Sequence, residues 1–235
     1  MNRILIWAIE QDFEVVETKA IHLLDTARKF NIDVETLGIG QTFTTFRDRL
    51  HILQDYLKTI DPEDIILVMD AYDTLFNSTS EVIFDKFKSK NTRILISAEK
   101  MYTYQYHQFL HKYDTIESEY RYVNAGTYMG YAGDVLKMIN ELFEVPFDSQ
   151  IDQGLMGVWL YDNFENTEKV QLDTNCDVFW ITSGDYFELK DIAEAGNELI
   201  NPYTNTKPSI IHNTGNAAPV HYETYIAVYK NIMKR

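Results

Sequence analysis

The sequence predicts an α/β fold in which a mixed, mainly parallel sheet is flanked by helices on both faces. Short apolar runs alternate with helical periodicity over roughly the first hundred residues. The run from Ile65 to Met69 is continuously apolar, which is typical of a parallel strand buried on both faces. Between Val15 and Ala27, apolar residues recur every three or four positions, as in an amphipathic helix. These patterns favour alternating strands and helices around one sheet.

The other expected elements extend this alternation along the chain. In the first half we expect strands at 4–9, 34–39, 64–69 and 93–97, and helices at 15–31, 43–60 and 81–88. In the less regular second half we expect strands at 120–123, 178–182 and 209–212, and helices at 133–143, 152–161 and 222–233. No repeat, low-complexity tract or linker interrupts the pattern, so residues 1–235 are expected to form one domain.

The composition is that of a protein with a substantial core, because 45% of the residues are hydrophobic. The single cysteine, Cys176, excludes an intrachain disulfide and suits a reducing compartment. The first residues lack the long apolar run and cleavage site of a signal peptide, and no stretch approaches the ~18 apolar residues of a membrane span. We therefore expect a soluble, cytoplasmic protein.

The charge is strongly acidic, with a formal net charge of −15 and a pI near 4.7. Between Asp134 and Ile200 the only basic residues are Lys137, Lys169 and Lys190. Phosphate backbones are bound by clustered Lys and Arg, so nucleic acid is a less expected partner. The acidic residues either form a solvated surface or include carboxylates that face a divalent cation.

Two carboxylates, Asp70 and Asp73, follow the buried strand at 64–69. Open α/β sheets place their ligand crevice at the carboxyl ends of strands, and Mg²⁺ and Mn²⁺ prefer oxygen ligands. An Asp-x-x-Asp pair is also common in ordinary turns. Both interpretations remain open on these residues alone.

His212 comes at the end of an expected strand and is followed by a loop containing Gly215 and Asn216. A histidine there could supply a nitrogen ligand, and the loop amides could donate to phosphate. Alternatively, His212 is a histidine at the edge of the core before an ordinary turn.

Two further segments carry polar residues that could face a sugar. Asn124 and Gly126 allow close backbone approach and hydrogen bonds to hydroxyls, or form a simple turn between a strand and a helix. Asp152 and Gln153 begin an expected helix, where they could contact a sugar or, for Asp152, only cap the helix.

In their order and spacing, these segments resemble the glycosyltransferase domain of the procollagen lysyl hydroxylases and its stand-alone viral and bacterial relatives. The resemblance covers nearly the whole chain and is carried by short blocks. These blocks are Thr36-Leu37-Gly38-Ile39-Gly40, Met69-Asp70-Ala71-Tyr72-Asp73, Ile96-Ser97-Ala98-Glu99, Val123-Asn124-Ala125-Gly126 with Gly130-Tyr131-Ala132, Asp152-Gln153, and His212-Asn213-Thr214-Gly215-Asn216.

The resemblance implies a Rossmann-like GT-A fold, a UDP-sugar donor and Mn²⁺ (or Mg²⁺) held by Asp70, Asp73 and His212. It implies a nucleotide and metal half at about 1–100 and an acceptor half at about 101–235. It places Tyr72 near the nucleotide and, more loosely, Arg47 near the diphosphate. Asn124 and Asp152 would lie near the sugar, with Asp152 a candidate catalytic base; Gly126, Gln153, Gly215 and Asn216 would line the donor site. The late loop is His-Asn-Thr-Gly-Asn, where relatives have His-Gly-Asn-Gly, and the Asn block is Asn-Ala-Gly, where relatives have Asn-Ser-Gly-Gly.

The function expected from the sequence is metal-dependent transfer of a sugar, glucose or galactose, from a UDP-sugar to a hydroxyl acceptor. The acceptor could be a hydroxylysine-type protein side chain, a glycan or a modified base, and the acidic second half argues against the base. Two alternatives are a non-catalytic module that binds nucleotide sugars or glycans, and a metal-dependent phosphohydrolase or nucleotidyltransferase.

Overall fold

The computed structural model describes residues 1–10, 12–102, 110–146, 150–182, 199–214 and 219–235. The strands are β1 (Asn2–Trp7), β2 (Glu35–Leu37), β3 (Ile65–Asp70), β4 (Thr74–Phe76), β5 (Ile94–Glu99), β6 (Tyr122–Tyr131), β7 (Val170–Leu172), β8 (Phe179–Ile181) and β9 (Ile210–His212). The helices are α1 (Phe13–Lys19), α2 (Ile21–Lys29), α3 (Asp48–Leu57), α4 (Ser80–Ser89), α5 (Leu110–Tyr113), α6 (Ala132–Glu144), α7 (Asp152–Asn163) and α9 (Pro219–Lys234).

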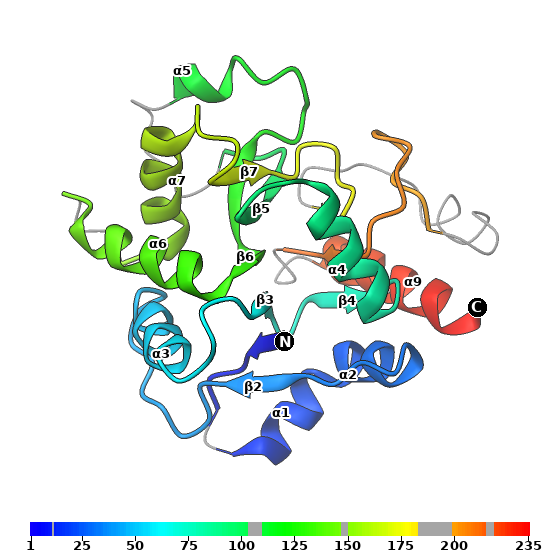
Figure 1. Cartoon of the computed structure of the whole chain (residues 1–235). Helices are drawn as coiled ribbons and strands as arrows, with labels where there is room; N and C mark the ends of the chain where they lie inside the picture. The colour runs from blue at the N-terminus through cyan, green and yellow to red at the C-terminus, as the bar shows by residue number, and fades with distance from the viewer. Residues whose placement is uncertain (11, 103–109, 147–149, 183–198, 215–218) are drawn as a thin grey trace.

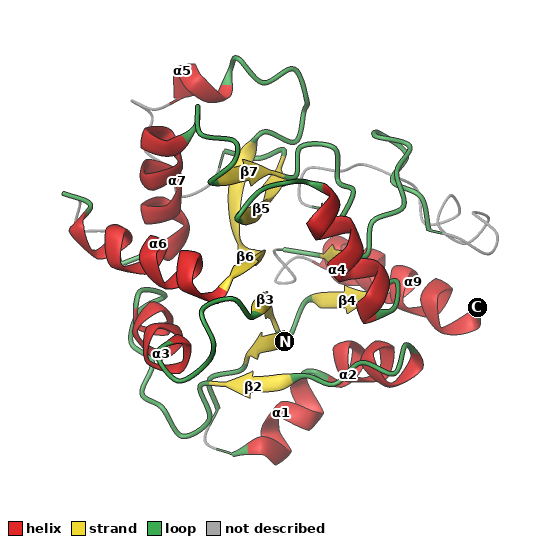
Figure 2. Cartoon of the chain, in the orientation of Figure 1, coloured by secondary structure: helices red, strands yellow, loops and turns green. Residues whose placement is uncertain are grey.

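A six-stranded sheet in the order β2-β1-β3-β6-β5-β7 forms the centre of the molecule (Figure 2). Its strands are parallel except β6, which runs antiparallel to both β3 and β5. The carboxyl ends of β1, β3 and β5 therefore meet at one edge of the sheet. This is the edge at which α/β proteins bind their ligands.

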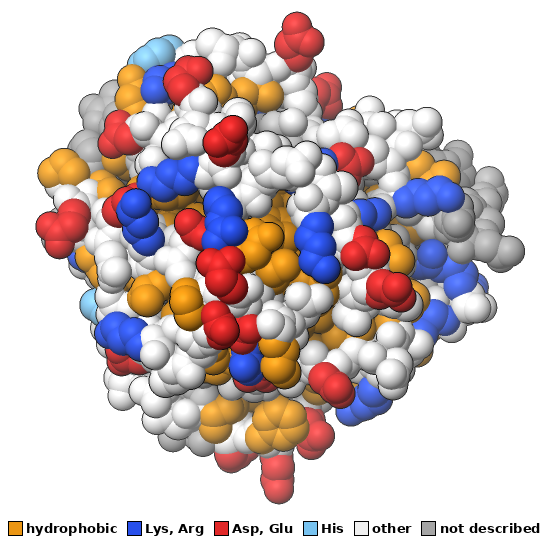
Figure 3. Space-filling model, in the orientation of Figure 1, with side chains coloured by type: hydrophobic (Ala, Val, Ile, Leu, Met, Phe, Trp, Pro, Cys, Tyr) orange, Lys and Arg blue, Asp and Glu red, His pale blue; other side chains and the backbone are white. Residues whose placement is uncertain are grey.

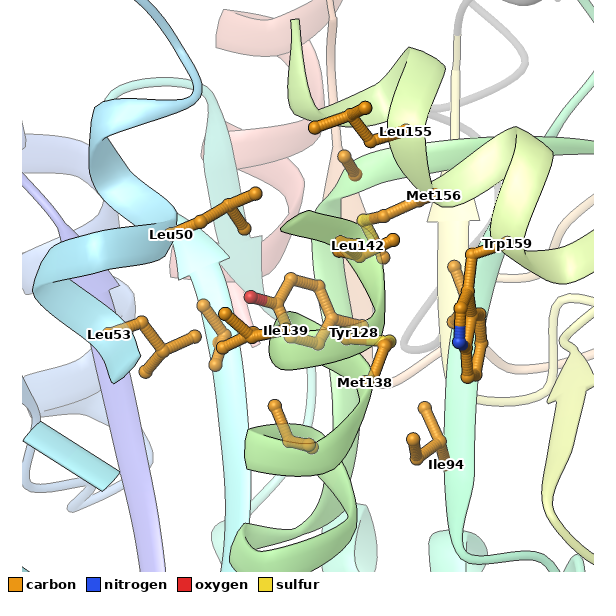
Figure 4. Close-up of a cluster of buried hydrophobic side chains, with 14 of the residues drawn as sticks. Leu50, Leu53, Ile94, Tyr128, Met138, Ile139, Leu142, Leu155, Met156 and Trp159 are labelled. Atoms are coloured by element: carbon orange, nitrogen blue, oxygen red, sulfur yellow. The ribbon is translucent and has the colours of Figure 1, made fainter. Parts of the chain in front are cut away.

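Helices cover both faces of this sheet, as the sequence predicts (Figure 1). On one face, α3, α6 and α7 pack in a buried cluster that includes Leu53, Ile139 and Trp159 (Figure 4). On the other face, α1, α2 and α4 pack in a second cluster that includes Leu23 and Phe84. Because a buried apolar cluster packs on each face, the sheet is a rigid support for side chains at its carboxyl edge.

A smaller three-stranded sheet, in the order β4-β9-β8, lies beside the main one. Strand β4 pairs antiparallel with β9, with Thr74 opposite His212. The turn between β3 and β4 is only Ala71 to Asp73, so the small sheet begins where the main sheet presents its carboxyl edge. This arrangement brings a residue from late in the chain to the end of β3.

Strand β6 carries an irregularity at the same edge. Ile96 of β5 pairs with Tyr128, but the next residue, Ser97, pairs with Asn124. The three intervening residues of β6, including Gly126, consequently have no partners on β5. Bulges of this kind redirect side chains and are frequent beside active sites.

Some expected elements differ from those in the structure. The helix expected at 15–31 is two helices, interrupted at Ala20, and the helix expected at 43–60 begins only at Asp48. Asn124 and Gly126 do not form a turn between a strand and a helix; they lie inside the ten-residue strand β6. Asn124 pairs with Ser97 of β5, and the residues of β6 from Thr127 onward pair with β3, so long-range pairing along the strand overrides the local turn preference of Asn and Gly. Strands β4 and β7, of three residues each, were not expected.

On the face seen in Figure 3, acidic and basic side chains are interspersed, with no gathered basic surface. Among the described residues, no helix is both long enough and apolar enough to cross a bilayer.

Candidate active site

Asp70, Asp73 and His212, which we call the metal cluster, converge at the carboxyl edge of the sheet. Each offers one ligand atom, and these atoms lie within 4.8 Å of one another. Asp70 is the last residue of β3, Asp73 ends the turn before β4, and His212 ends β9. The structure thus brings together the three residues that the sequence suggested as metal ligands.

The pairing of β4 with β9 explains why the metal cluster forms. The backbone amide of Asn213, the residue after His212, donates to the carbonyl of Asp73 at 2.8 Å. The hydroxyl of Thr74 donates back to the carbonyl of Asp70, which tightens the turn. The side chain of Thr182 in turn donates to the Asn213 side-chain oxygen at 2.7 Å. The backbone of all three residues is therefore fixed before any ligand binds.

His212 is almost fully buried, with 2% of its surface exposed. Within the described part of the chain, neither ring nitrogen makes a hydrogen bond. Nε2 lies 3.3 Å from an oxygen of Asp73 and 3.8 Å from an oxygen of Asp70. Burial alone would lower the pKa of His212, but the carboxylates of Asp73 and Asp70 outweigh it and raise that pKa. Such a buried nitrogen, facing two carboxylates, suits a metal ligand.

Gly126 makes this close approach possible. A Cβ atom at position 126 would lie 2.1 Å from Cε1 of His212 and 2.8 Å from an oxygen of Asp70. Any larger residue would push one of the two side chains away. The absence of a side chain at Gly126 is therefore what allows the imidazole and the carboxylate to share one space. The donor set, two carboxylates and an imidazole, fits Mn²⁺ or Mg²⁺.

Arg49, on α3, joins the metal cluster to a second group of polar residues. Its Nη1 donates to Asp70 at 2.6 Å, and its Nε donates to Asp152. The arginine is buried, and the two carboxylates raise its pKa despite the opposing effect of burial. Burial raises the pKa of Asp70, and the Arg49 guanidinium opposes this rise. Arg49 is therefore a permanent positive charge between two acids.

The second group, which we call the amide cluster, consists of Asp152, Gln153 and Glu99. Asp152 also accepts a hydrogen bond from the backbone amide of Gln153 at 2.8 Å. The Gln153 side chain donates to Glu99 at 2.8 Å and accepts from the backbone amide of Ala125 at 3.2 Å. All three side chains are buried. The amide cluster is thus held by hydrogen bonds within the protein.

A cavity of about 230 Å³ opens beside the metal cluster. Its polar wall contains Asp70, Asp73 and Arg49, and its remaining wall is largely aromatic and apolar. That wall is formed by Trp7, Ile9, Phe43, Phe46, Ala71 and Tyr72. A pocket that combines carboxylates with aromatic rings can hold a ligand with a charged part and a flat part.

The other residues suggested by the sequence lie in different places. Tyr72 lines the cavity. Asn124 is buried and accepts from the backbone amide of Gly126 at 3.0 Å, so it stabilises the bulge. The guanidinium of Arg47 lies 5.6 Å over the ring of Phe143, whereas Arg49 reaches the site. Gly215 and Asn216 lie outside the described residues.

Arg49 and Glu99 are two charged site residues to which the sequence patterns gave no role. In the sequence, Arg49 is one of several polar residues on an amphipathic helix, and its position there resembles that of a solvent-facing residue. Glu99 ends an apolar strand directly after the Ile-Ser-Ala block, and this position at a strand end was the available signal.

Comparison with known proteins places these features in context. The family model described as the PLOD GT domain matches residues 16–231. A procollagen-lysine,2-oxoglutarate 5-dioxygenase of Drosophila melanogaster is 29% identical over 203 residues, covering 81% of this chain and 28% of that protein. An uncharacterized protein of Acanthamoeba polyphaga mimivirus is 28% identical over 173 residues, covering 72% of this chain and 36% of that protein. The chain thus spans only about a third of the length of these relatives.

Solved structures share the fold at low sequence identity. A glycosyltransferase involved in glycosylation of the major capsid of PBCV-1 matches with a TM-score of 0.56 and 10% identity, over 97% of this chain and 98% of that one. A galactosyltransferase, LgtC, solved with donor and acceptor sugar analogs, matches with a TM-score of 0.52 and 15% identity, over 100% of this chain and 94% of that one. The fold of this chain is therefore GT-A, with a mostly parallel central sheet.

Proposed function

Because the chain belongs to the PLOD GT domain family and is a glycosyltransferase, we propose that it transfers a hexose from a UDP-sugar to a hydroxyl acceptor in a metal-dependent reaction. The observation that carries this proposal is the metal cluster beside the aromatic cavity. In a transferase with a nucleotide-sugar donor, the leaving group is a diphosphate whose negative charge grows as the glycosidic bond breaks.

Asp70, Asp73 and His212 would hold Mn²⁺ or Mg²⁺. A bound divalent cation would neutralise the diphosphate as it leaves. The protein's part is to keep the three ligands converged, which the β4–β9 pairing and Gly126 do without a ligand. Since Arg49 compensates some of the charge of Asp70, the cluster tolerates two neighbouring carboxylates.

The cavity gives the nucleotide a place next to the metal cluster. Tyr72, Phe43 and Phe46 offer ring faces on which a uracil can stack, and Asp70 and Asp73 lie in the same cavity wall. A UDP bound with its base among the rings would direct its diphosphate towards the metal cluster. The amides of Gly215 and Asn216 are proposed as further diphosphate donors, and Arg47 as a basic residue near it.

Asp152, with Gln153 and Asn124, is proposed to face the transferred sugar. Asp152 accepts from Arg49 through one carboxylate oxygen and from the backbone amide of Gln153 through the other, so both of its oxygens already hold donors within the protein. This favours a role in binding sugar hydroxyls over proton removal from the acceptor. Arg49 fixes the position of Asp152 relative to Asp70, so the sugar would be held in a fixed position relative to the metal.

For the acceptor we propose a hydroxyl on a protein side chain of the hydroxylysine type. The Drosophila melanogaster relative is named a procollagen-lysine,2-oxoglutarate 5-dioxygenase, and a relative from Caenorhabditis elegans is named a multifunctional procollagen lysine hydroxylase and glycosyltransferase. The net charge of −15 suits a cationic protein substrate better than a nucleic acid.

The test is a screen for UDP release from several UDP-sugars, each with and without Mn²⁺. We expect slow hydrolysis of one donor, only with metal, and faster release when peptides containing hydroxylysine are added. Absence of UDP release from every donor would contradict the proposal. Release of inorganic phosphate or pyrophosphate would favour a phosphohydrolase or nucleotidyltransferase.

A further inference from the structure

A chain of hydrogen bonds behind the cavity connects Lys19, Glu10 and Tyr72. The hydroxyl of Tyr72 donates to Oε1 of Glu10 at 2.8 Å, and Nζ of Lys19 donates to the same oxygen at 2.7 Å. Glu10 follows β1, Lys19 ends α1, and Tyr72 lies in the turn after β3. Three separate segments thus meet at one carboxylate oxygen.

Glu10 is well placed to fix a ring. Its side chain is 16% exposed, whereas that of Lys19 is 53% exposed. The Lys19 and Tyr72 hydrogen bonds lower the pKa of Glu10, so the carboxylate is charged and accepts strongly. The proposed function assigns three rings of the described cavity wall to the base: Tyr72, Phe43 and Phe46. Of these, only Tyr72 has a hydroxyl that Glu10 can hold by a hydrogen bond.

Glu10 also contacts the loop before α3 through its backbone. Its carbonyl accepts from the amide of Gly40 at 2.8 Å. Gly40 has a φ of 68°, and the loop that follows it carries Phe43 and Phe46 into the cavity wall. One residue therefore anchors both the turn that holds Tyr72 and the loop that holds the two phenylalanines.

We propose that Glu10 is a positioning residue for the donor nucleotide, acting through Tyr72; the inference rests on the proposed function. With the hydroxyl held, the ring keeps one orientation before the base binds. Stacking of the base on the ring therefore does not carry the entropy loss of ordering a side chain. Without Glu10, Tyr72 can rotate out of the cavity wall. The metal cluster and the amide cluster make no contact with Glu10 among the interactions that the structure describes, so the chemical step is unaffected.

The test compares UDP affinity in the presence of Mn²⁺, and the donor KM and kcat, among matched variants. Glu10→Ala should weaken UDP binding and raise the donor KM by about fivefold, the factor expected from one lost hydrogen bond, with kcat within about twofold. Glu10→Gln keeps an acceptor oxygen and should restore most of the affinity. Glu14→Ala, on the exposed side of α1, removes the same charge without reaching Tyr72 and is the control.

Tyr72→Phe should reproduce the effect of Glu10→Ala, and the double variant should be no weaker than either single one. Equal UDP affinity in wild type and Glu10→Ala, or fully additive effects of the two substitutions, would overturn the inference while leaving the proposed function intact. A wild-type protein that binds no UDP would instead overturn the proposed function, and this inference with it.

Discussion

The metal cluster and the amide cluster lie at the same edge of the sheet and share Arg49, yet they are built differently. In the amide cluster, Asp152 and Gln153 have hydrogen-bond partners within the protein. In the metal cluster, the buried imidazole of His212 has no hydrogen bond in the described part of the chain, and two carboxylates face it. The amide cluster is complete as folded, whereas the metal cluster has the donors that a cation would need. Substitutions in the two clusters should therefore differ in what they damage.

The largest effect is expected from Asp73→Asn, which keeps the shape of the side chain but removes a charged ligand. Metal-dependent turnover should fall about a thousandfold, because charge stabilisation of the leaving group is lost. The melting temperature without metal should change little, since the substitution also relieves repulsion between Asp73 and Asp70. The measurements are UDP release and thermal denaturation, with the exposed Asp85→Asn as control. Wild-type turnover in Asp73→Asn would refute the ligand assignment.

Gly126→Ala should reduce metal affinity by about 10- to 100-fold without removing any ligand, because the new Cβ displaces His212 or Asp70. Titration with Mn²⁺ measures the affinity. Adding His212→Ala removes the atoms nearest the new methyl group and should recover the thermal stability of the metal-free protein, though not metal binding. If Gly126→Ala binds Mn²⁺ normally, the absence of a side chain at position 126 does not set the spacing of the ligands.

Arg49→Met should damage both clusters, because it leaves Asp70 and Asp152 without their shared positive charge. We expect the free energy of unfolding to fall by about 3 kcal/mol and turnover to fall with it. Urea denaturation and UDP release are the measurements. Arg47→Met, two residues away and stacked over Phe143, tests which arginine serves the site. A larger loss of turnover in Arg47→Met than in Arg49→Met would reverse the assignment.

The smallest change in metal binding is expected from Gln153→Ala, although the protein should become less stable. The substitution leaves the buried carboxylate of Glu99 and the amide of Ala125 without the Gln153 side chain, which costs about 1–3 kcal/mol. Affinity for Mn²⁺ should stay close to that of the wild type, while turnover falls because Gln153 is proposed to face the sugar. A large loss of Mn²⁺ affinity would indicate that the two clusters do not act separately.

Much of the fold could be predicted because its strongest signals are local. The apolar run of β3 and the periodicity of α2, α4 and α6 depend on neighbouring residues alone. Strand β6 was misjudged at Asn124 and Gly126, because the strand is set by the pairing of Asn124 with β5 and of the residues from Thr127 onward with β3, which local sequence does not encode. Three-residue strands such as β4 and β7 carry too few residues for a periodic pattern.

In the candidate site, too, residues with a local sequence signal could be predicted and residues defined by long-range contacts could not. Asp70 and Asp73 stand next to a strong strand signal, so their place at the sheet edge could be predicted from position. Arg49 could not, because its two partners are 21 and 103 residues away and nothing in its own helix marks it as buried. The link between Glu10 and Tyr72 spans 62 residues and is likewise visible only in the folded chain. Contacts between distant segments are set by the sheet order, which the sequence pattern did not specify.

The most direct measurement for the central claim is a calorimetric titration of Mn²⁺ in the presence of UDP into three proteins: wild type, Asp73→Asn and Gln153→Ala. We predict binding near one cation per chain in the wild type and in Gln153→Ala, and no measurable binding in Asp73→Asn. Equal binding by wild type and Asp73→Asn would contradict the assignment of the cation to Asp70, Asp73 and His212.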